Sequence, residues 1–131
     1  MRFFRRREHD PADAAIRARF AVVAGHVEAA QRALLAAIPT ARDEGVQLAQ
    51  ALAEMARRLD AAEAVMESWR DERVAHEWTK CSDALAQART EADRLRLEPG
   101  DLGFEVLNAR VGDVLHPLET FADVERDLRR R

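Results

Sequence analysis

Residues 48–69 read LAQALAEMARRLDAAEAVMESW, and this stretch decides the fold. Its apolar residues recur at alternating steps of four and three, which is the spacing of one face of an α-helix. The members of this stripe are Leu48, Leu52, Met55, Leu59, Ala62, Met66 and Trp69. The stretch contains neither Gly nor Pro and is rich in Ala, so it predicts a long amphipathic helix.

The same spacing occurs on both sides of this stretch. An upstream stripe follows the Asp10-Pro11 start signal, and it consists of Ile16, Phe20, Val23, Val27, Ala30, Leu34 and Ile38. The next stripe downstream consists of Val74, Trp78, Cys81, Leu85, Ala88, Ala92 and Leu95. The last consists of Phe104, Leu107, Val111, Val114, Leu118, Phe121 and Leu128, with Val124 beside the polar Glu125. The chain therefore predicts helices over about 11–38, 41–69, 73–97 and 102–129.

Prolines and glycines mark the ends of these helices. Pro39 is predicted to end the first helix, and Thr40 to cap the second. The loop signal at residues 98–103, EPGDLG, is the strongest in the chain. Pro117 lies inside the last stripe without changing its register, so we expect one kinked helix there.

The connection between the second and third helices is open to two interpretations. The step from Trp69 to Val74 is five residues, which breaks the spacing and predicts a turn at residues 68–73. A continuous helix of about 55 residues with one skipped position would produce almost the same pattern. The second interpretation gives three helices with a long, coiled-coil-like central one.

Length and composition favour an all-α fold with a single domain. The chain has 131 residues, 26 of them Ala, and only 5% aromatic residues with no Tyr, which disfavours a β-sandwich or barrel. We predict an antiparallel up-down-up-down four-helix bundle over residues 10–131, preceded by a basic tail at 1–9. Ala at core positions buries less area than Leu, so we also expect self-association into a homo-oligomer.

Arginine gathers at the two ends of the chain. Residues 1–7 hold four Arg and no acidic residue, and residues 126–131 hold four Arg and one acidic residue. Residues 8–125 hold 13 basic and 23 acidic residues, so this part of the chain would repel a polyanion. Basic residues that bind nucleic acid more often follow a face of the fold, so the sequence carries no strong nucleic-acid signal.

In an antiparallel bundle of four helices, both chain ends lie beside the turn between helices two and three. We predict a docking surface for an anionic partner there, because Arg binds carboxylates and phosphates bidentately. The predicted partner-binding residues are Arg2, Arg5, Arg6, Arg7, Arg126, Arg129, Arg130, Arg131, Trp69, Arg70 and Arg73. The alternative is that the terminal Arg residues are only solvated and that both Trp side chains belong to the core.

The first functional hypothesis is a non-enzymatic interaction or adaptor protein whose partners are another protein, itself or both. A second hypothesis is a metal- or small-ligand-binding bundle that uses the mid-helix residues His26, Glu54, Glu91 and His116. These four form no complete ligand set, so we expect neither metal nor cofactor. A third hypothesis is a peripheral protein on an anionic membrane or granule surface, anchored by Phe3 and Phe4.

The sequence offers no support for catalysis. It contains no phosphate-binding loop, zinc spacing or nucleophile elbow, so we expect no enzyme. Cys81 lies on an apolar stripe, where a thiol behaves as a small hydrophobic group. One cysteine excludes an internal disulfide framework and predicts a cytoplasmic protein, and no apolar run reaches the ~18 residues of a membrane span.

Overall fold

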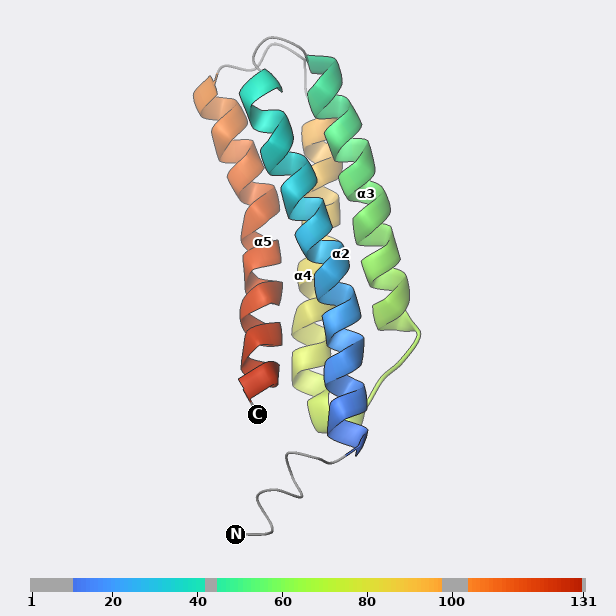
Figure 1. The fold of residues 1–131 in the computed structure, drawn as a ribbon. Helices are drawn as coiled ribbons and strands as arrows, with labels where there is room; N and C mark the ends of the chain where they lie inside the picture. Colours follow the sequence, from blue (N-terminus) through green and yellow to red (C-terminus); the bar gives the residue numbers. More distant parts are fainter. Residues whose placement is uncertain (1–10, 42–44, 98–103, 131) are drawn as a thin grey trace.

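The structure, a computed structural model, describes residues 11–41, 45–97 and 104–130. These ranges contain no strand and form α2 (Pro11–Ala41), α3 (Gly45–Glu67), the 3-10 turn η1 (Glu72–Val74), α4 (Ala75–Leu97) and α5 (Phe104–Arg130). Successive helices run in opposite directions (Figure 1), and α5 returns to pack on α2. The predicted up-down-up-down four-helix bundle is confirmed for the described residues.

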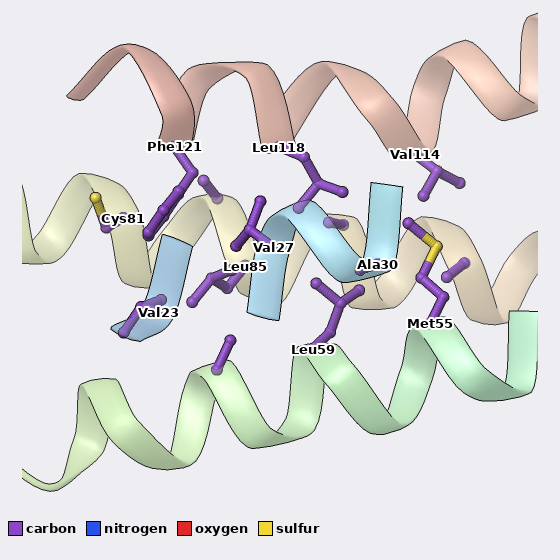
Figure 2. Packing of buried hydrophobic residues seen from close by; sticks show 14 of the residues in the cluster. Val23, Val27, Ala30, Met55, Leu59, Cys81, Leu85, Val114, Leu118 and Phe121 are labelled. Atoms are coloured by element: carbon purple, nitrogen blue, oxygen red, sulfur yellow. The ribbon is translucent and has the colours of Figure 1, made fainter. Parts of the chain in front are cut away.

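The predicted stripes face inward and form one core. Figure 2 shows side chains from all four helices meeting there, among them Val27, Leu59, Leu85 and Leu118. Small residues lie at the centre of the core, since Ala30, Ala62 and Ala88 are all fully buried. Because Ala has the shortest apolar side chain, helices that meet at these positions can approach closely.

The chain turns between α3 and α4, so the alternative of one continuous central helix is wrong. After α3 ends at Glu67, the Ser68 N–H donates to the Ala64 carbonyl at 3.2 Å, and Ser68 Oγ donates to the Val65 carbonyl at 2.6 Å. Asp71 then caps η1, because its carboxylate accepts the backbone N–H of Arg73 at 2.9 Å. Ser and Asp side chains that bond to the local backbone allow this turn to form without Gly or Pro.

The first helix is longer than predicted. The sequence predicts its end at residue 38, whereas α2 continues through Pro39 and Thr40 to Ala41. Pro39 has φ fixed near the helical value, so the backbone can stay helical through it, although Pro39 cannot donate a hydrogen bond to the carbonyl four residues earlier. Thr40 therefore belongs to α2 and does not cap α3, which begins at Gly45 rather than at residue 41.

The other helix ends differ by smaller amounts. The predicted end of the second helix at 69 is wrong because the backbone leaves the α3 helix after Glu67, and α4 begins at Ala75 rather than 73 because η1 precedes it. Pro117 lies inside the single helix α5, which ends at Arg130 rather than at residue 129. The predicted tail at 1–9, the loop at 98–103 and the predicted start of the last helix at 102 lie outside the described residues.

Candidate docking end of the bundle

Three segments that are distant in sequence lie at one end of the bundle. The start of α2, the connection between α3 and α4, and the end of α5 all lie at the lower end of Figure 1. We call this region the docking end and define it by the described residues Arg19, Trp69, Arg70, Arg73, Trp78, Arg126, Arg129 and Arg130. Of the other predicted site residues, Arg2, Arg5, Arg6, Arg7 and Arg131 lie outside the described residues.

Trp69 belongs to the core. Its side chain is buried and meets the ring of Phe20 edge-on, with ring centroids 5.0 Å apart and an interplanar angle of 85°. The guanidinium of Arg19 lies 5.5 Å from the Trp69 ring centroid, within the range of a cation–π contact. Trp69 Nε1 is buried without a hydrogen-bond partner in the described structure. Because its ring is buried against Phe20, Trp69 is not available to contact a partner at the docking end.

Trp78 is the more accessible of the two tryptophans. It is half-buried, and its Nε1 donates to the Met66 carbonyl at 3.0 Å, which ties the start of α4 to the end of α3. The exposed Arg70 places its guanidinium 4.3 Å from the Trp78 ring centroid. This stacked pair forms an amphipathic surface at the turn. The sequence places both tryptophans on core stripes, but the structure buries only Trp69 and leaves Trp78 half-buried.

Arg73 is held by two carboxylates. Its Nη2 lies 2.9 Å from Asp71 Oδ2, and its Nη1 lies 3.7 Å from Asp13 Oδ1 in the first turn of α2. Hydrogen bonds from the side chain and the backbone N–H of Arg73 lower the pKa of Asp71 to about 2. Arg73 thus connects the turn to α2, and part of its charge is neutralised within the molecule.

The arginines of α5 differ in their partners. Arg126 Nη1 lies 3.3 Å from Asp123 Oδ1, and Arg129 Nε lies 3.0 Å from Glu125 Oε1. Arg130 is exposed and has no ion-pair partner among the described residues. The docking end therefore combines neutralised arginines with arginines whose charge is available.

Glu125 is a buried carboxylate that the sequence analysis did not single out. The residue is only 5% exposed, whereas Val124 is half-buried. A signal was present, because the steps from Phe121 to Glu125 and on to Leu128 are four and three residues. The glutamate thus occupies the core position of the stripe, at the level where the docking end begins.

The candidate metal ligands do not come together. Glu91 and His116 line one open groove of about 860 Å³ between α4 and α5, but Glu54 on α3 forms ion pairs with Arg57 and Arg58 instead. Hydrogen bonding to Arg57 is the main reason that the pKa of Glu54 is lowered. His26 is half-buried on α2. The described part of the chain contains no group of three His, Cys, Asp or Glu that could hold a metal ion.

Four charged residues that line this groove form two ion pairs with each other. Arg94 Nη1 lies 2.9 Å from Glu91 Oε1, and Arg110 Nη1 lies 3.7 Å from Asp113 Oδ2.

The thiol of Cys81 is fully buried, and burial is the main cause that raises its pKa to about 12. A thiol with so high a pKa is a poor nucleophile near neutral pH.

Comparisons with known proteins add no relative. No protein-family model, no curated protein and no solved structure matches the chain.

Proposed function

We propose that this chain is a non-enzymatic helical interaction protein that self-associates and docks an acidic segment of a partner protein through the docking end. The observation that carries the proposal is the meeting of the α2 start, the α3–α4 connection and the α5 end at one end of the bundle. This arrangement places the first turns of α2 and the last turns of α5 at the same end of the molecule.

Charge segregation supports an acidic partner. Residues 8–125 hold 13 basic and 23 acidic residues, whereas residues 1–7 hold four Arg without an acid. An acidic segment would be repelled by the body of the bundle and attracted only at this end. Arg70, stacked on Trp78, and Arg130, which has no ion-pair partner among the described residues, offer the guanidinium groups that a carboxylate can bind in a forked, bidentate manner.

The internal ion pairs favour moderate rather than tight binding. Arg73, Arg126 and Arg129 already have carboxylate partners, so an incoming acidic side chain must compete with Asp71, Asp123 and Glu125. Solvent-accessible ion pairs contribute about 0–1 kcal/mol each, so exchange at Arg73 and Arg126 is feasible at little cost, whereas exchange at Arg129 leaves the buried Glu125 without its partner. We infer a reversible interaction that salt weakens.

We also propose a cytoplasmic location. The single cysteine, Cys81, is free and buried, which suits a reducing compartment. No helix among the described residues has the length and apolar character needed to cross a bilayer.

The test is fluorescence anisotropy with a labelled Asp/Glu-rich peptide. Raising the salt from about 0.05 M to about 0.3 M should weaken binding severalfold, because screening shortens the reach of exposed charges. Removing residues 1–7 should weaken binding without lowering Tm. Changing Arg129, Arg130 and Arg131 to Gln should also weaken binding, with only a small loss of Tm, because Arg129 pairs with the buried Glu125. The matched control changes Arg57, Arg58 and Arg94 to Gln, which removes the same charge elsewhere on the bundle.

Two outcomes would contradict the proposal. Equal losses in the control and in the Arg129, Arg130 and Arg131 variant would show that only net charge matters. Binding to phosphatidylserine vesicles but not to the peptide, abolished by changing Phe3 and Phe4 to Ser, would replace the adaptor role with the membrane role.

A further inference from the structure

The outer side of α2 carries a second stripe of helical spacing. Each member lies two residues before a buried residue of α2, so the members recur at steps of four and three. Every member is exposed, and α2 lies at the front of the bundle in Figure 1 with no other helix over it. We call this set the α2 outer stripe, and it consists of Ala14, Ala18, Ala21, Gly25, Glu28, Arg32 and Leu35.

The α2 outer stripe is apolar for a surface that faces water. Five of its seven members are Ala, Gly or Leu, and Leu35 is 51% exposed. Val22, next to the stripe, is 54% exposed. Surface helices normally present charged and polar residues on the side opposite the core. An outer side with so few charged residues is typical of a helix that packs on a further partner there.

Two opposite charges interrupt this apolar surface. Glu28 and Arg32 are both exposed, and neither has an ion-pair partner among the described residues, including each other. The sequence predicts an ion pair between them, because they lie four residues apart on one helix. Their charges are therefore available to a partner.

We propose that the part of the α2 outer stripe within residues 21–35 is the interface of a homodimer in which α2 packs antiparallel on α2 of a second copy. The two-fold axis passes at the level of Ala30, midway between Glu28 and Arg32. Residues equally far from such an axis face each other, so Glu28 of each copy faces Arg32 of the other. The two charges of the stripe thus neutralise each other in the dimer.

The same axis fits the largest side chain of the stripe to its smallest member. Leu35 and Gly25 lie equally far from the level of Ala30, so Leu35 of each copy faces Gly25 of the other. A Cβ atom built on Gly25 meets nothing within 4 Å, which leaves room for that leucine. No other position of the stripe offers as much space close to the backbone.

A groove beside the stripe extends the contact. It has a volume of about 380 Å³ and lies between α2 and α5, where Leu35 and Leu115 form its apolar walls. Glu28, Arg32 and Glu119 line its rim. A helix that packs on the α2 outer stripe would cover this groove and the half-buried Leu115.

The size of the contact sets its strength. The two helices would overlap from residue 19 to Ala41, which is about 35 Å at 1.5 Å per residue, over a width of about 10 Å. The total buried area of roughly 700 Å² is below the ~1,200 Å² of stable interfaces, so the dimer forms reversibly and at high concentration. This inference rests on the self-association in the proposed function, but it needs nothing from the docking end.

The experiment is sedimentation equilibrium of the full chain from low micromolar to several hundred micromolar. Glu28→Arg and Arg32→Glu each place like charges across the axis, so each should raise the dimer Kd at least about tenfold. An equimolar mixture of the two single variants restores opposite charges between chains, and its Kd should return to within about threefold of the original. The control Glu67→Arg makes the same charge change on exposed α3 and should leave the Kd unchanged.

The mixture also separates binding from folding. A single variant that failed to fold could not associate in the mixture, so recovery there shows that both chains are folded. A wild-type chain that stays monomeric throughout the range, or a mixture that associates no better than the single variants, would overturn the proposal. Peptide binding by the monomeric Glu28→Arg chain is measured separately, so the docking end can fail while the dimer stands, and the reverse.

Discussion

Trp78 Nε1 donates a hydrogen bond to the Met66 carbonyl at 3.0 Å, and this bond joins the first turn of α4 to the last turn of α3. Trp78→Phe keeps an aromatic ring but removes the donor, so the free energy of unfolding should fall by about 1 kcal/mol in urea titrations. Arg70→Gln is the control, because it removes the charge over the ring and keeps the bond. A larger loss for Arg70→Gln would mean that the stacked guanidinium, not the bond, holds the turn.

The central leucines should be far more sensitive to truncation than an exposed one. Leu52, Leu59 and Leu85 are at most 1% exposed, and each change to Ala should cost about 2–5 kcal/mol, because it leaves a cavity. Leu97 is 79% exposed, so Leu97→Ala should change stability by about 0.5 kcal/mol or less. Urea titrations of the four variants provide the measurement, and similar losses in all four would show that these stripes do not form the core.

Two glycines lie inside helices without a packing reason within the described residues of a single chain. Gly25 in α2 and Gly112 in α5 are exposed, and a Cβ atom built on either meets nothing within 4 Å. Gly→Ala at each should raise the free energy of unfolding by about 0.5–1 kcal/mol, because Ala loses less backbone entropy in a helix. Thermal unfolding at low micromolar concentration measures the monomer. A lower Tm at that concentration would show that the outer surface is already crowded.

Helical spacing predicted the fold because burial on one face follows directly from it. The inward residues of all four helices belong to one core, from Ile16 in α2 to Leu128 in α5. The spacing misplaced the end of α2, since the local rule that Pro ends a helix takes no account of its position. The spacing also placed Glu125 in the inward position, but hydropathy favours the neighbouring Val124 there, so the burial of Glu125 was missed.

The candidate site was predictable at the level of topology and not at the level of contacts. An even number of antiparallel helices is enough to bring the α2 start and the α5 end together. The pairing of Arg73 with Asp71 and Asp13 depends on the backbone path of a turn that has no sequence motif. The burial of Trp69 depends in the same way on how that turn directs its ring toward Phe20.

Cys81 should make the stability depend on alkaline pH. Burial raises the pKa of its thiol from 9.0 to about 12, so folding favours the protonated form. This stabilisation is fully present below pH 9 and is lost as the pH rises from about 9 toward about 12. The chain has no Tyr and a single Lys, so few other groups titrate in this window. Tm measured from pH 7.5 to 11 should fall more steeply for the wild type than for Cys81→Ala. Parallel curves would assign the loss to other groups.

Glu125 should be replaceable by an apolar residue, whereas its partner should not be removable alone. The carboxylate is 5% exposed at a core position, and its Oε1 lies 3.0 Å from Nε of Arg129. Replacing a buried charge by a hydrophobic residue of similar size is often neutral or stabilising by about 1–4 kcal/mol. We expect the lower part of this range for Glu125→Leu, because the Arg129 side chain is 62% exposed and stays solvated without its partner.

Arg129→Ala instead leaves the buried carboxylate without its ion pair and should lower the free energy of unfolding by about 1 kcal/mol. Urea titrations at pH 7 should therefore rank Glu125→Leu at or above the wild type and Arg129→Ala below it. The opposite ranking would show that the carboxylate makes a contact that leucine cannot replace.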